Sequence, residues 1–226
     1  MNARHAARIA ATALLLLGCA STETGNPPAQ PESGLDVARI MFIVLPNMGD
    51  PGFLSGEADP LLAAGGTLRI TAVETELDTF VVPIGTVPPA FSASLPASVS
   101  GWLRLQVIAA DGQRLAPLDV LASALTLGGV EPLPNTLQDC LTVPTDVALG
   151  GAGVARIRLR NDCAEPIAFD APSVRLGLVE VDPVGPFELR AGLDFVISSP
   201  APLTDSDEDV VILRAGGERR AITVTR

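Results

Sequence analysis

Short apolar runs with a period of two recur along this chain, and Gly or Pro residues separate them. Leu103, Leu105 and Val107 alternate with Arg104 and Gln106, which is typical of a strand with one buried face. The same period occurs at 67–72, 80–84, 91–95 and 154–160, and short apolar runs at 167–169, 187–189, 195–197, 210–213 and 221–225 predict further strands. Because 21 Gly and 20 Pro punctuate these runs, the pattern predicts an all-β chain rather than helices.

A cluster of Gly and Pro divides the β-patterned chain in two. The segment 128–138 has the composition of a linker, so we predict β-sandwich domains at 35–127 and 139–226. About seven strands are expected in the second region, which is the number in an immunoglobulin-like sandwich. A single continuous sandwich is the alternative. Because 47% of residues are hydrophobic and only 4% aromatic, we expect Ala, Val and Leu to fill the cores.

The first strand is expected at 37–45, where nearly continuous apolar residues indicate a central strand covered on both faces. The segment 46–66 that follows has no period and is long for a loop within a compact domain. It contains Met48, Phe53 and Leu54 among acidic residues, so these three are candidates for contact with a partner. The alternative is a loop whose apolar side chains close one end of the sandwich.

Trp102 is the only Trp, and it lies out of phase with Leu103 and Leu105. We expect it to cap a core, and an exposed binding aromatic is the alternative.

After this strand, Asp111-Gly112 predicts a tight hairpin turn because both residues tolerate positive φ angles. Farther along, a change of phase at Gly177 within 173–181 predicts a β-bulge.

The N-terminus has the features of a secretory signal. Arg4 and Arg8 precede a short apolar run at 9–17 that ends in a small residue. This run is too short for a transmembrane helix, which needs roughly 20 apolar residues. We therefore predict a signal peptide at 1–18, and the polar, Pro-containing segment 19–34 is expected to be a disordered tether.

The residues Leu16-Leu17-Gly18-Cys19 resemble the lipobox of bacterial lipoproteins. That resemblance implies cleavage before Cys19 and attachment of acyl chains such as palmitate to it, which would anchor the protein stably in a membrane. The residue after Cys19 is Ala20 rather than the Asp that retains such proteins at the inner membrane, which implies the outer membrane of the cell envelope. An ordinary secretory signal with a chance Cys is the alternative.

The residues that are missing exclude most catalytic chemistry. The only His is His5 in the leader, and the chain contains no Lys and no Tyr. Nucleophile activation by His, zinc sites with His ligands and Schiff-base chemistry are therefore excluded in the exported part. A hydrolase based on paired carboxylates is the remaining enzymatic alternative. The net charge of −11 also argues against nucleic acid as a partner.

Two cysteines remain once Cys19 is assigned to the lipid anchor. Cys140 and Cys163 lie in a chain predicted to be exported, so we expect them to form a disulfide. Free buried thiols are the alternative.

Between the two cysteines, the strand at 154–160 carries three arginines, Arg156, Arg158 and Arg160, which alternate with apolar residues. We expect a solvated face paired with carboxylates. A site for an anionic group such as lipopolysaccharide phosphate is the alternative.

The segment 200–209 carries alternating acidic residues, Asp205, Asp207 and Asp209. The spacing begins like an EF-hand, but Val210 and Gly216 occupy the positions of its required Gly and Glu. We therefore expect a solvated acidic loop and no cofactor. A weak Ca²⁺ site formed by these three carboxylates is the alternative.

The region 139–226 contains Val143-Pro144, then Leu159-Arg160-Asn161 before Glu165-Pro166-Ile167, and Gly216-Gly217 before the last strand. In these residues it resembles the immunoglobulin-like domains of the abnormal-spindle and hydin type. Such domains are structural and interaction modules, so the resemblance implies binding rather than catalysis.

Taken together, these features predict a membrane-anchored envelope lipoprotein that acts as a non-catalytic binding or assembly module. Its expected partners are the membrane, through the lipid anchor, and another envelope protein or a glycan. A calcium-dependent adhesive or glycan-binding lipoprotein on the cell surface is the alternative.

Overall fold

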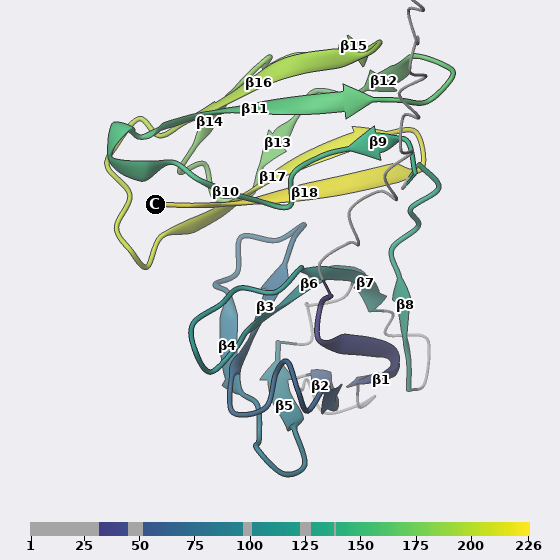
Figure 1. Cartoon of the computed structure of the whole chain (residues 1–226), viewed down its shortest axis with the longest axis vertical. Coiled ribbons are helices and arrows are strands. Elements are labelled where there is room, and N and C mark those ends of the chain that lie inside the picture. The colour runs from purple at the N-terminus through teal and green to yellow at the C-terminus, as the bar shows by residue number, and fades with distance from the viewer. Residues whose placement is uncertain (1–31, 45–51, 97–100, 123–127, 138) are drawn as a thin grey trace, which may run out of the picture. The chain divides into compact units, whose positions relative to one another are not determined.

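The computed structural model describes residues 32–44, 52–96, 101–122, 128–137 and 139–226 (Figure 1). Within these ranges the regular structure is β-strand, apart from a short 3₁₀ turn at Gly150–Ala152. The prediction of an all-β chain is therefore confirmed. No helix in the described part of the chain has the length and hydrophobicity needed to cross a membrane.

The N-terminal strands form two sheets, which we call the first sandwich. One sheet has the order β1 (Leu35–Val44), β2 (Gly52–Ala58), β5 (Ala90–Leu95). The other has the order β4 (Phe80–Pro83), β3 (Thr67–Ala72), β6 (Gly101–Ile108), β7 (Leu118–Ala122), β8 (Val130–Pro132). Taken in chain order, these are the A-B-E and C′-C-F-G sheets of an immunoglobulin-like sandwich, with β8 added beside the last strand.

Alternate side chains of both sheets fill the core of the first sandwich. On β6, Leu103, Leu105 and Val107 are buried, as the alternation predicts. From the facing sheet, Phe42 and Leu54 enter the same core. Each fully buried Leu or Phe contributes about 1.5–3 kcal/mol relative to an exposed position, so this layer supplies much of the folding energy.

Two expectations for the start of the first sandwich are wrong. β1 matches the expected strand to within two residues, but it lies at the edge of its described sheet, with Phe42 buried and Met41 46% exposed. The segment 46–66 is not one long loop, because β2 lies within it and pairs with both β1 and β5. An apolar run predicts a strand, but it does not show how many of the strand's faces will be covered.

The C-terminal strands form the second sandwich, whose two sheets face each other in Figure 1. One sheet has the order β14 (Glu180–Asp182), β16 (Gly192–Ser198), β11 (Val154–Asn161), β9 (Leu141–Thr142). The other has the order β13 (Ser173–Val174), β17 (Glu208–Ala215), β18 (Glu218–Thr225), β10 (Asp146–Ala148). β12 (Ile167–Phe169) and β15 (Phe187–Leu189) form a separate two-stranded ribbon. If β9, β11, β13, β14, β16, β17 and β18 are lettered A to G in chain order, the two sheets have the orders D-E-B-A and C-F-G, with β10 added beside G. This order confirms the expected immunoglobulin-like topology.

A disulfide links Cys140, just before β9, to Cys163 in the turn after β11. Their Cα atoms are 4.8 Å apart, so the predicted pairing is confirmed. Asn161 fixes the same turn from inside, because its Nδ2 donates to the carbonyl oxygens of Glu165 (2.9 Å) and Leu189 (2.8 Å). This turn is therefore held both covalently and by a buried amide.

The predicted bulge at Gly177 is instead a crossing between the two sheets of the second sandwich. β13 precedes it in one sheet and β14 follows it in the other. Gly177 has a φ of 72°, and the backbone N–H groups of Leu176 and Leu178 donate to the Asp209 carboxylate at 2.8 and 2.7 Å. The side chains change phase in the sequence because the chain changes sheets.

Candidate functional site

The three predicted contact residues do not share one environment. Phe53 on β2 is 40% exposed, whereas Leu54 is fully buried in the core of the first sandwich, so its assignment as a contact residue is wrong. Successive strand residues point to opposite faces, which is why neighbours separate in this way. Met48 lies outside the residues that the structure describes.

Phe53 belongs to an apolar patch on the outer face of the first sandwich. It pairs across the strands with Ile43, which is half-buried, and lies diagonally from the exposed Met41. We call Met41, Ile43 and Phe53 the β1–β2 patch. Because exposed apolar side chains of this kind are grouped rather than scattered, the patch is a candidate surface for a protein partner.

The three acidic residues of the proposed calcium site have separate partners. Asp205 pairs with Arg226 (2.9 Å), and Asp207 accepts a hydrogen bond from the Thr204 N–H (2.6 Å). Asp209 is buried and accepts backbone N–H groups from the crossing at Gly177. Among the described residues, no cluster of three or more His, Cys, Asp or Glu side chains is arranged to hold a metal ion.

The arginines of β11 have the alternation that the sequence predicts. Leu159 is buried, while Arg156, Arg158 and Arg160 are exposed. Arg158 pairs across the strands with Asp194 (2.6 Å), and Arg160 pairs with Asp162 (3.1 Å). The expected solvated face, paired in part with carboxylates, is therefore what the structure shows.

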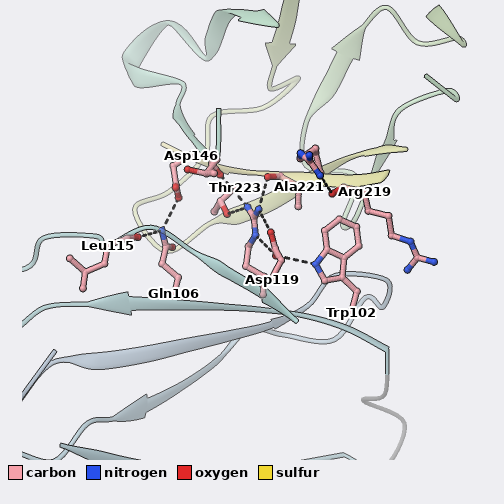
Figure 2. A network of polar contacts seen from close by, with 11 residues as sticks. Trp102, Gln106, Leu115, Asp119, Asp146, Arg219, Ala221 and Thr223 are labelled. Atoms are coloured by element: carbon pink, nitrogen blue, oxygen red, sulfur yellow. Dashed lines mark hydrogen bonds and ion pairs between the residues drawn. The ribbon is translucent and has the colours of Figure 1, made fainter. Parts of the chain in front are cut away.

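A buried interface that the sequence did not predict joins the two sandwiches. The polar positions of β3 and β6 were expected to face solvent, but Thr71, Arg104 and Gln106 are each only 3% exposed. Arg104 bonds to Thr223 of β18 and to Thr145, just before β10, and Gln106 bonds to Asp146 at the start of β10. The network in Figure 2 therefore lies between segments far apart in the sequence.

Arg104 is the centre of this interface. Its Nε and one terminal nitrogen donate to the two carboxylate oxygens of Asp119 at 2.9 and 2.8 Å. Its remaining N–H groups reach the second sandwich, at the Thr223 hydroxyl (3.0 Å) and the carbonyls of Thr145 (3.1 Å) and Ala221 (2.6 Å). All five guanidinium N–H groups can thus be used, which is the arrangement that a buried Arg requires.

Burial opposes the charge of Arg104, but nearby carboxylates more than offset that effect. Asp119, through both its charge and its hydrogen bonds, raises the pKa of the Arg104 guanidinium above its ordinary value, with smaller contributions from Asp146 and Glu208. Arg104 is therefore charged in the interface. An ion pair in such a position depends on both partners, because either one alone would be a buried uncompensated charge.

An apolar cluster around Trp102 lies beside the Arg104–Asp119 ion pair. Trp102 is 1% exposed, and its indole N–H donates to Asp119 at 3.0 Å (Figure 2). Its ring packs in a cluster with Val73 from the first sandwich and Val210 and Ile212 from the second. The expectation that Trp102 caps a core is confirmed, and this core lies between the sandwiches.

Further polar contacts extend the interface toward the other end of β6. Gln106 donates to the Asp146 carboxylate (2.9 Å) and accepts from Arg114 (3.2 Å). Glu208, which is 8% exposed, pairs with Arg69 (2.9 Å) and Arg114 (3.4 Å). The Glu208 carboxylate therefore pairs with two arginines across the interface, and loss of both would leave a buried charge without a counter-ion.

A separate buried contact ties the segment between β8 and β9 to β18. Glu218 accepts hydrogen bonds from the backbone N–H of Thr136 (2.6 Å) and from its hydroxyl, and it pairs with Arg220 (2.7 Å). Burial alone would raise the pKa of Glu218, but the hydrogen bonds from Thr136 and the charge of Arg220 lower it below the ordinary value of 4.5. The ionised form is therefore favoured by folding.

We predict that Glu218 makes stability depend on pH in the acidic range. Because its folded pKa is depressed, its contribution is fully present above about 4.5 and is lost as the pH falls through the lower folded value. The Glu218→Gln variant should be less stable than the native protein at neutral pH, and this difference should shrink below about 4.5. Urea unfolding at a series of pH values measures it. Glu180→Gln, at an exposed position on β14, is the control, and an equal pH dependence in both variants would contradict the assignment.

One signal in the sequence pointed toward the interface. The run 210–213 in β17 is apolar at four consecutive positions, and all four are buried. Such a run is typical of a strand covered on both faces. It indicated a second covering layer, but nothing in the sequence identified the polar face of β3 and β6 as that layer.

Comparisons with known proteins identify no family. No protein-family model matches the chain, and no curated protein matches it. Among solved structures, the tandem immunoglobulin domains A164-A165 of titin align with 84% of this chain and 94% of theirs, at 8% identity and a TM-score of 0.24. Extracellular domains 3–5 of Drosophila OTK align with 87% of this chain and 67% of theirs, at 15% identity and a TM-score of 0.22. The topology above rests on strand order, because TM-scores this low do not establish a shared fold.

Proposed function

We propose that this protein is a lipid-anchored, non-catalytic binding or assembly module of the bacterial cell envelope. In this proposal Cys19 carries the acyl chains, the chain is held at the outer membrane, and β-sandwich domains at 35–127 and 139–226 are presented beyond a tether. Another envelope protein is the proposed partner. The lipobox residues Leu16-Leu17-Gly18-Cys19 support the anchor.

The observation that supports binding is the β1–β2 patch. Met41 and Phe53 are 46% and 40% exposed although the alternate residues of the same strands, Phe42 and Leu54, are fully buried. Aromatic and Met side chains are enriched in protein interfaces, where their burial supplies much of the affinity. The polar residues that the structure gathers most closely, around Arg104, are already bonded to one another, so they support folding rather than catalysis.

The proposal predicts a specific crosslink from the patch and membrane attachment through Cys19. A photo-crosslinking amino acid at Phe53 should capture one envelope protein in intact cells. The same probe at Val184, which is 76% exposed on the second sandwich, is the matched control and should not capture that protein. Replacing Cys19 with Ser should release the protein from the membrane fraction and abolish the acyl mass on the N-terminal peptide.

Three outcomes would count against parts of this proposal. Equal capture from Phe53 and Val184 would show that the patch is not a specific contact surface. Absence of any protein crosslink, with the patch accessible from outside the cell, would favour a glycan as the ligand. Membrane association that survives Cys19→Ser would exclude Cys19 as the anchor.

A further inference from the structure

Two neighbouring loops of the first sandwich hold aliphatic side chains almost entirely in solvent. Leu61 and Val87 are each 92% exposed. Single exposed aliphatic residues are common on protein surfaces, but these two lie on loops that are hydrogen-bonded to each other. The Gly65 N–H donates to the Gly85 carbonyl (3.2 Å), and the Ala58 N–H donates to the Pro89 carbonyl (2.8 Å).

Local hydrogen bonds hold the Leu61 side chain outward. The Asp59 carboxylate accepts the N–H groups of Leu61 (2.7 Å) and Leu62 (3.1 Å), forming one capped turn. In this turn Ala63 is fully buried and Leu62 half-buried, so Leu61 is the residue left pointing away from the core. Leu61 is therefore exposed by a defined local structure.

A third loop completes this end of the first sandwich. The hairpin 109–117 lies against the others, because the position of a side chain at Gly66 would be filled by the backbone of Ile108 and Ala109. We call the loops 59–66, 84–89 and 109–117 the loop end. It carries exposed carboxylates, Asp59 and Asp111, beside its two aliphatic side chains.

The described chain also starts at the loop end. The Asp59 N–H donates to the carbonyl of Gly34 (2.9 Å), and a side chain at Gly34 would contact Leu62 and Ala63. Only the segment 20–31 separates Cys19 from the first described residue, Glu32. Even when fully extended, a chain of that length spans at most about 45 Å. Acyl chains on Cys19 would therefore keep the loop end within that distance of lipid.

From this placement we infer that the loop end docks on the membrane surface, with Leu61 and Val87 inserted among the lipid headgroups. This inference rests on the proposed anchor at Cys19. Two aliphatic side chains bind lipid weakly by themselves, but attachment to the same membrane supplies a high effective concentration. The carboxylates of Asp59 and Asp111 favour zwitterionic lipids over anionic ones, because like charges repel.

The test supplies the anchor chemically, so it does not depend on acylation in cells. The mature chain from Cys19 is purified with the Cys140–Cys163 disulfide intact, which leaves the Cys19 thiol for coupling to a maleimide lipid. Vesicles contain phosphatidylcholine and phosphatidylethanolamine with brominated acyl chains, which quench nearby indoles. The probe is a Leu61→Trp variant, and a Val184→Trp variant is the control. Native Trp102 is 1% exposed and gives a constant background.

The expected result is loss of fluorescence and a blue shift for Leu61→Trp, with neither change for Val184→Trp. Adding Val87→Ser should lower the ratio of docked to undocked protein on the order of tenfold, since an aliphatic side chain then leaves the lipid. Phosphatidylglycerol in the vesicles should lower it further. Equal quenching of the two Trp variants, or none in either, would overturn the inference. If Leu61→Trp is unquenched by lipid but protected in isolated envelopes, the loop end contacts a protein instead.

Discussion

Replacing Asp119 with Ala is expected to lower the free energy of unfolding by about 3–5 kcal/mol, because it leaves a charged Arg104 buried without its counter-ion. Arg104 is 3% exposed, and two of its hydrogen bonds end on Asp119. The indole N–H of Trp102 would lose its acceptor in the same variant. Urea unfolding followed by the fluorescence of Trp102, which reports directly on this interface, measures the change.

The exposed pair Arg158–Asp194 provides the matched control for this prediction. Its side chains approach to 2.6 Å, closer than Arg104 and Asp119 at 2.8 Å, but they are 57% and 66% exposed. Because exposed ion pairs contribute only about 0–1 kcal/mol, Asp194→Ala should change stability little. Equal losses in Asp119→Ala and Asp194→Ala would show that burial does not determine the contribution of Asp119.

Removing the disulfide is expected to cost a similar amount by a different mechanism. The bridge joins residues 23 apart in the sequence, and closing a loop of this size stabilises the folded state by about 3.5 kcal/mol in the chain-entropy model. The double variant Cys140→Ser, Cys163→Ser should lose that much free energy of unfolding. Urea unfolding of the oxidised native protein and of the double variant gives the difference.

Reduction of the native protein distinguishes loop closure from damage caused by the substitutions. If the bridge acts through the unfolded chain, the reduced native protein and the double variant should have matching stabilities, both below the oxidised protein. A loss well under 1 kcal/mol would contradict the chain-entropy account. It would indicate that β9–β11 pairing and Asn161 hold the turn without the bridge.

Local patterns correctly predicted most strands, and the two cysteines left in a chain expected to be exported predicted the disulfide. The alternation of Leu103, Leu105 and Val107 assigned one face of β6 to a core, and these three residues are buried there. Asp111-Gly112 predicted a turn, and Gly112 has the positive φ of 88° that such a turn requires. These predictions succeeded because strand periodicity and turn geometry depend on residues close together in the sequence.

The candidate sites were predicted less well. Leu54 was grouped with Phe53 although adjacent strand residues face opposite sides, and this error followed from missing β2 within 46–66. Asp205, Asp207 and Asp209 were grouped by spacing, but Asp209 is the first of them to enter a strand and its carboxylate lies buried under the crossing at Gly177. Spacing along a loop does not determine which carboxylates converge.

By itself, the sequence determined the all-β class, the turns and which face of each alternating strand is apolar. Only the tertiary structure decided what covers the other face. Arg104 and Gln106 have the pattern of solvated residues, yet the second sandwich buries both. It supplies the Thr145 carbonyl as an acceptor for Arg104 and the Asp146 carboxylate for Gln106, which lie 41 and 40 residues farther along the sequence. The physical reason is that alternation reports the polarity of a face, whereas burial of a polar face depends on whether a distant surface can satisfy its hydrogen bonds.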